Sequence, residues 1–176
     1  MTDPVLAAHH AYEEWDYGAY RGRGARQTDC VSHLALVLRD AGLLSFEVGD
    51  DAWLRLMVDP MAPWSMVHEV HRQLPGTVLV DHLGRVAGEV GPQVPTAGRW
   101  HAVQGWQSLT DGRVGVRDAG HALLWYAETA TEGFTIESQP GTGPTIWRGR
   151  WADRVELYKA GVAWCVLPEL AHLETT

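Results

Sequence analysis

Apolar residues recur with a helical period in the first half of the chain. Between residues 30 and 42 they occupy one helical face, at Val31, Leu34, Ala35 and Leu38. The pair Thr28-Asp29 supplies a candidate N-cap for this helix, and Gly42 is a typical C-terminal residue. Similar spacing predicts a short N-terminal helix within residues 5–17 and a further helix over residues 65–74.

After residue 76 the period shortens towards two, which is typical of strands. The predicted strands cover residues 77–81, 100–106, 120–127, 134–138 and 161–167. Residues 141–144 read as a loop, and residues 151–158 as a short helix. Since helices come first and antiparallel strands follow, we expect an α+β fold. Its N-terminal helices would pack on one face of an antiparallel sheet, within a single domain spanning residues 1–176.

Charge and hydropathy exclude several classes of partner. The 176 residues carry 14 basic and 22 acidic side chains, a net charge of −8, which argues against a nucleic-acid partner. No segment is long and apolar enough to span a membrane, so no membrane partner is expected. The first ten residues lack the features of a signal peptide. We therefore expect a cytoplasmic protein, with export by a route lacking a cleaved signal left open, and the oligomeric state undetermined.

The chain has two cysteines, Cys30 and Cys165, too few for a disulfide framework. Cys30 falls in the first turn of a predicted helix, where unpaired N–H groups and the helix dipole favour a thiolate. Cys165 lies in the apolar segment 162–167 and is expected to be buried. Cys30 is thus the candidate nucleophile, although a buried cysteine often serves only as a small apolar side chain.

A thiolate nucleophile needs a base, and the base needs a group that orients it. His121 begins the strongest predicted strand, and a hairpin centred near Thr129 would set Glu137 opposite it on the next strand. Either residue alone could equally be structural, with His121 a strand-end histidine and Glu137 a surface charge. Gln104 and Gln139 are alternative polar helpers.

Three short motifs resemble the papain-like cysteine peptidases of the NlpC-like group. They are Tyr20…Gly22…Asp29-Cys30-Val31-Ser32, then residues 120–124 (Gly-His-Ala-Leu-Leu), then residues 136–138 (Ile-Glu-Ser). That group consists mostly of bacterial cell-wall peptide hydrolases and related amidases. The family has Asp-Cys-Ser-Gly where this chain has Asp29-Cys30-Val31-Ser32, and its third residue is more often His, Asn or Gln than Glu.

The resemblance implies a papain-like fold and a hydrolase that acts on amide bonds of a peptide or peptidoglycan-like substrate. Cys30 would be the nucleophile, His121 the base and Glu137 the orienting residue, while Tyr20 would lie near the cysteine and help to stabilise the oxyanion. The reaction would pass through a thioester and need no cofactor or metal. Hydrolysis and acyl transfer would differ only in the step that resolves this thioester, so the sequence does not separate a peptidase, a deamidase and an acyltransferase.

Two other classes of function compete with a hydrolase. Cys30 and His33 share a helix face, as do His68 and His71, so these four side chains could bind zinc. The spacing matches no known zinc-finger pattern. Alternatively, the chain is a non-catalytic binding module that keeps a papain-like fold, and the reactivity of Cys30 would separate this reading from an enzyme.

Overall fold

The computed structural model describes residues 3–43, 78–80, 94–107, 119–158 and 161–169. The predicted helix at 65–74 lies outside these residues, as do His68 and His71. Among the described residues, no helix is long and apolar enough to cross a membrane.

Residues 3–43 form two helices and a small parallel strand pair. Helix α1 runs from Pro4 to His10, and helix α2 runs from Cys30 to Asp40. Strand β1 (Asp16–Tyr17) pairs in parallel with β2 (Gln27–Thr28), and a 3-10 turn, η1 (Arg23–Ala25), lies between them. The N-terminal helix is therefore shorter than predicted. The backbone N–H of Asp16 donates to Arg26 O at 3.0 Å, so Asp16 belongs to the strand pair and not to the helix.

Six antiparallel strands form the main sheet, in the order β3-β8-β4-β5-β6-β7. The strands are β3 (Val78–Val80), β4 (Arg99–Gln107), β5 (Ala119–Ala127), β6 (Glu132–Gln139), β7 (Gly143–Arg150) and β8 (Gly161–Val166). Five of these match predicted strands. Strand β7 was missed, because its exposed alternate positions include Arg148 and Arg150, and its place is set by pairing with β6 along its whole length.

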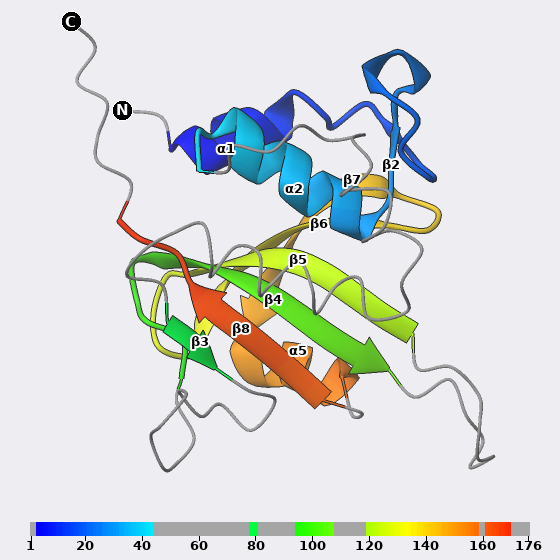
Figure 1. Cartoon of the computed structure of the whole chain (residues 1–176). Helices are drawn as coiled ribbons and strands as arrows, with labels where there is room; N and C mark the ends of the chain where they lie inside the picture. Colours follow the sequence, from blue (N-terminus) through cyan, green and yellow to red (C-terminus); the bar gives the residue numbers. More distant parts are fainter. Residues whose placement is uncertain (1–2, 44–77, 81–93, 108–118, 159–160, 170–176) are drawn as a thin grey trace, which may run out of the picture.

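Helices cover both faces of this sheet (Figure 1). Helices α1 and α2 lie on one face, while the short helix α5 (Trp151–Leu157) lies on the other. The predicted α+β class is confirmed, but α5 adds a layer beyond the expected single face of helices.

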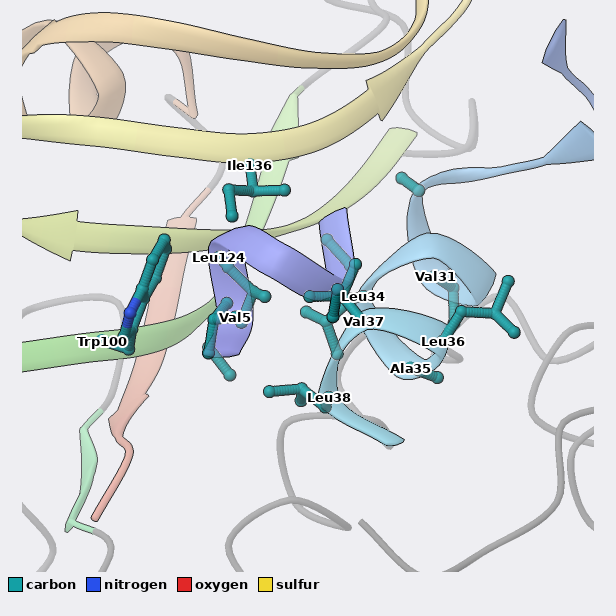
Figure 2. Close-up of a cluster of buried hydrophobic side chains, with 14 of the residues drawn as sticks. Val5, Val31, Leu34, Ala35, Leu36, Val37, Leu38, Trp100, Leu124 and Ile136 are labelled. Atoms are coloured by element: carbon teal, nitrogen blue, oxygen red, sulfur yellow. The ribbon is translucent and has the colours of Figure 1, made fainter. Parts of the chain in front are cut away.

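Alternation along β5 decides which core each side chain enters. Ala122 and Leu124 pack with α1 and α2, in the cluster shown in part in Figure 2. Leu123 and Trp125 pack with Trp151 of α5 and form a second core. His121 has the same parity as these two residues, so its side chain leaves β5 on the face that α5 covers.

Candidate active site

A complete capping box forms the start of α2 and sets the position of Cys30. The Asp29 side chain accepts from Ser32 N at 2.8 Å, and Ser32 Oγ accepts from Asp29 N at 3.0 Å. Cys30 is consequently the first residue of the helix. Because Cys30 is the first helical residue, its backbone N–H has no acceptor within the helix. This N–H lies at the positive end of the helix dipole.

One hydrogen bond ties this helix start to the end of β6. Ser138 Oγ donates to Thr28 O at 2.8 Å, and Thr28 precedes Cys30 by two residues. Ser138 is fully buried, and its neighbour Glu137 leaves β6 on the opposite face. The same stretch of β6 therefore anchors the helix that carries Cys30 and supplies the carboxylate of the site.

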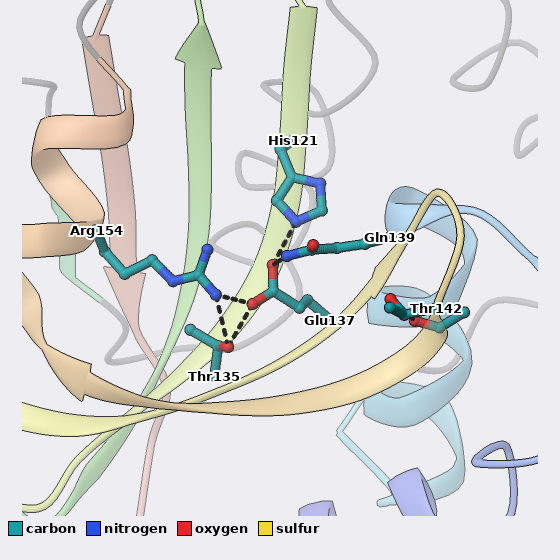
Figure 3. A network of polar contacts seen from close by, with 7 residues as sticks. His121, Thr135, Glu137, Gln139, Thr142 and Arg154 are labelled. Carbon is teal, nitrogen blue, oxygen red and sulfur yellow. Dashed lines mark hydrogen bonds and ion pairs between the residues drawn. The ribbon is translucent and has the colours of Figure 1, made fainter.

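His121 and Glu137 form a short ion pair, with His121 Nε2 2.7 Å from Glu137 Oε2 (Figure 3). Their register differs from the prediction. Leu124 pairs with Ile136, so the hairpin is centred on Ala130 rather than Thr129, and Glu137 lies diagonal to His121. A shift of two residues keeps both side chains on one face, which is why the contact survives the register error.

Cys30 is the second partner of His121. Burial lowers the pKa of His121, but hydrogen bonds with Cys30 and Glu137 and the charges of both residues outweigh burial and raise that pKa to about 9. Glu137 engages Nε2, so a hydrogen bond with the cysteine sulfur would use Nδ1. Both the cysteine and the carboxylate act on the imidazole, which therefore favours the protonated form.

The two reacting groups keep a small exposed fraction. Cys30 is 9% exposed, and the His121 side chain is 18% exposed. Cys165, by contrast, is fully buried between β3 and β4, and burial raises the pKa of its thiol to about 12.

Glu137 is saturated with hydrogen-bond donors (Figure 3). Besides His121, Gln139 Nε2 donates to Oε2 at 2.6 Å, Thr135 Oγ1 donates to Oε1 at 2.5 Å, and Arg154 forms an ion pair with Oε1. Burial raises the pKa of Glu137, but the hydrogen bond from His121 and the charges of Arg154 and His121 outweigh burial and lower it to about 2. The carboxylate is consequently ionised at every physiological pH.

The predicted polar helpers divide between the two faces of the sheet. Gln139 belongs to the site through Glu137. Gln104 has the parity of Ala102, which packs with α1 and α2, and its Nε2 donates to Gly105 O at 3.4 Å. Tyr20 is buried in the core cluster that also contains Cys30, and its role at the oxyanion stays a prediction.

Sequence reasoning missed three residues of this region: Tyr17, Arg154 and Tyr158. Burial raises the pKa of the half-exposed Tyr17, and the charges of Cys30 and Asp29 raise it further. The signal for Arg154 and Tyr158 was present in the sequence. Trp151, Arg154 and Tyr158 share one face of a predicted helix, and a cation on an apolar face calls for a buried anion.

His33, one of the four zinc ligands considered from the sequence, is hydrogen-bonded to another histidine. His33 Nε2 lies 3.1 Å from His9 Nδ1, and both rings are buried. In the described part of the chain, no group of three or more His, Cys, Asp or Glu side chains could hold a metal ion.

The chain was also compared with known proteins. No family model, no curated protein and no solved structure matches it.

Proposed function

We propose that this protein is a cysteine hydrolase that cleaves an amide bond, with Cys30 as nucleophile, His121 as general acid and base, and Glu137 as the orienting residue. The observation that carries the proposal is the position of His121. Its Nε2 is bonded to Glu137, a hydrogen bond with Cys30 is among the causes that raise its pKa, and Cys30 begins a helix. A nucleophile, its base and a third group that orients the base form the minimal set for covalent catalysis.

The reaction follows from these contacts. The Cys30 thiolate attacks the amide carbonyl carbon, and the carbonyl oxygen becomes an oxyanion. The backbone N–H of Cys30 is available to donate to that oxyanion, an interaction worth about 2.7–4 kcal/mol in other enzymes. Protonated His121 then gives its proton to the leaving amine as the C–N bond breaks, and a thioester remains on Cys30.

Water completes the cycle. Neutral His121 takes a proton from a water molecule, which attacks the thioester carbonyl and releases the acid product and the Cys30 thiolate. Glu137 stays ionised throughout and stabilises the imidazolium. If an amine replaced water in this step, the same site would act as an acyltransferase. If the leaving amine were ammonia from a side-chain amide, it would act as a deamidase.

The proposed substrates are peptides or peptidoglycan fragments. The short motifs around Cys30, His121 and Glu137 resemble those of cell-wall peptide hydrolases, so peptides and peptidoglycan fragments are the first compounds to test.

Thiol labelling tests the proposal without knowledge of the substrate. At about pH 7, iodoacetamide should modify Cys30 at least ~10-fold faster than Cys165, and His121→Ala should remove most of that difference. Equal and slow labelling of both cysteines would favour a non-catalytic binding module. Incubation with a panel of peptides and cell-wall fragments, followed by mass spectrometry, should then reveal an acyl adduct on Cys30. The Cys30→Ala variant is the control that must form none.

A further inference from the structure

We infer that Arg154 is a positioning residue of this site, which holds Glu137 as an oriented carboxylate and acts on Cys30 and His121 only through it. The inference rests on the proposed function, because it assigns a role within the same chain of contacts.

Arg154 and Glu137 meet in a buried network of hydrogen bonds. Glu137 is fully buried, and Arg154 is 5% exposed. Arg154 Nη2 donates to Glu137 Oε1 and also to Thr135 Oγ1, at 3.1 Å for the latter. The Thr135 hydroxyl in turn donates to the same carboxylate oxygen. Two groups, Arg154 and Thr135, thus fix Oε1, while Oε2 remains for Gln139 and His121.

Arg154 is the counterion that the buried Glu137 carboxylate requires. When Cys30 is a thiolate and His121 an imidazolium, a buried Glu137 carboxylate without a counterion would leave the site with a net negative charge. Burial then favours a protonated carboxyl group, which no longer stabilises an imidazolium. Arg154 completes an alternating series of charges, Cys30 negative, His121 positive, Glu137 negative and Arg154 positive. A neutral Asn or Gln in place of Glu137 would need no such cation. Arg154 is therefore needed because residue 137 is a charged glutamate.

Aromatic side chains hold Arg154 and its helix α5 in place. The guanidinium carbon lies 4.3 Å from the ring centroid of Trp147 on β7, and Trp151 at the start of α5 packs on Trp125 and Trp164. The start of the helix is therefore fixed to the sheet, and the guanidinium itself lies over a strand residue. An arginine held by aromatic packing and by a shared hydroxyl loses little further side-chain entropy when it binds a carboxylate.

Labelling of Cys30 with iodoacetamide as a function of pH tests the inference. Arg154→Gln should shift the rise of the labelling rate to higher pH and slow labelling about 10-fold at pH 7, because one pH unit corresponds to a tenfold change in thiolate. Arg154→Lys keeps the charge and should recover most of the rate. Arg150→Gln is the matched control, because it removes an exposed arginine that pairs with Asp153 of the same helix, and it should label like the unaltered protein.

A double-mutant cycle distinguishes action through Glu137 from a direct effect of charge. In a Glu137→Gln background, adding Arg154→Gln should change the labelling rate less than about 2-fold. A full tenfold loss in that background would overturn the inference, as would unchanged labelling in Arg154→Gln accompanied by a lower urea midpoint, since Arg154 would then be merely structural.

A measurement on the unaltered protein keeps the test independent of variants that fail to fold. The ¹³C signal of the Glu137 carboxyl group should retain the shift of the ionised form down to about pH 4. A titration near the ordinary glutamate value would overturn the inference. Failure of the proposed function looks different, because Cys30 in the unaltered protein would then label as slowly as Cys165 whatever the state of Glu137.

Discussion

The imidazole rings of His9 and His33 are hydrogen-bonded to each other between α1 and α2, with Nδ1 of His9 3.1 Å from Nε2 of His33. Both rings are buried, and they meet edge to face at an angle of 76°. Such a bond needs one nitrogen with a proton and one without, so the accepting ring must be neutral and the two rings cannot both be protonated.

This pair predicts loss of stability in mild acid. Burial, opposed in part by Glu13, lowers the pKa of His9 to about 4. Burial and the charge of His9, opposed in part by Glu137, lower the pKa of His33 to about 3. The unfolded chain binds these protons already below about pH 6.5, so the free energy of unfolding should fall as the pH drops from there towards 4. The slope should approach about 1.4 kcal/mol per pH unit for each histidine.

Urea unfolding at a series of pH values measures this dependence. The variant His9→Asn/His33→Gln keeps amide groups near the bonded nitrogens but cannot titrate, so it should lose less stability in acid than the unaltered protein. An identical acid dependence in the two proteins would count against the histidine pair as its source. Buried His101 should add to the same slope in both proteins, because burial lowers its pKa to about 4.

Replacement of Glu137 should change the titration of His121. The pKa of His121 is raised to about 9 by its bonds with Cys30 and Glu137, despite burial. In Glu137→Gln the amide still accepts a hydrogen bond but carries no charge, so the pKa of His121 should fall by about one unit or more towards 6.5. NMR titration of the labelled ring measures it. Glu128→Gln, which removes an exposed glutamate of the same hairpin, should leave it at about 9.

The same ion pair gives stability a second dependence on pH. Folded His121 binds its proton up to about pH 9, whereas the unfolded chain releases it near 6.5. The stabilising contribution is therefore fully present below about pH 6.5 and is lost as the pH rises through 9. In urea unfolding, His121→Ala should flatten this alkaline decline, and a decline of undiminished slope would assign it to other groups.

Gly105 should be intolerant of a side chain. It lies opposite His121 in the register of β4 and β5, and a Cβ there would lie 2.2 Å from Cγ of Tyr158. The Tyr158 ring lies 6.4 Å from the His121 ring, centroid to centroid. Gly105→Ala should therefore destabilise the fold by about 1–3 kcal/mol through overpacking and slow Cys30 labelling by displacing Tyr158. In Gly24→Ala the new Cβ meets nothing within 4 Å, so its urea midpoint and labelling rate should match the unaltered protein.

The cap of α2 should contribute measurably to stability. Asp29→Ala removes the acceptor for Ser32 N and should cost about 1 kcal/mol in urea unfolding, whereas Asp29→Asn keeps an oxygen in the same place and should cost less. Equal losses in the two variants would mean that the charge of Asp29, rather than its hydrogen bond, stabilises the helix start.

Local patterns predicted most of the secondary structure that the structure describes. The apolar face from Val31 to Leu38 and the cap at Asp29 predicted α2, and period-two alternation predicted β4, β5 and β6. These features depend on neighbours within a few residues in sequence. Strand β7 and the strand pair β1–β2 went unnoticed, because they exist through pairing with a partner rather than through their own apolar pattern.

The candidate site likewise combines features that local sequence predicts with features that only tertiary contacts set. The sequence by itself determined that Cys30 begins a helix and that His121 and Glu137 leave neighbouring strands on one face, since caps and alternation are local properties. Only the tertiary structure decided that Ser138 ties the start of α2 to β6, that Glu137 meets His121 on the diagonal, and that Arg154 lies behind them. Those contacts join segments 16 to 110 residues apart, and their partners are chosen by packing and by the need to neutralise buried charge, which no local pattern encodes.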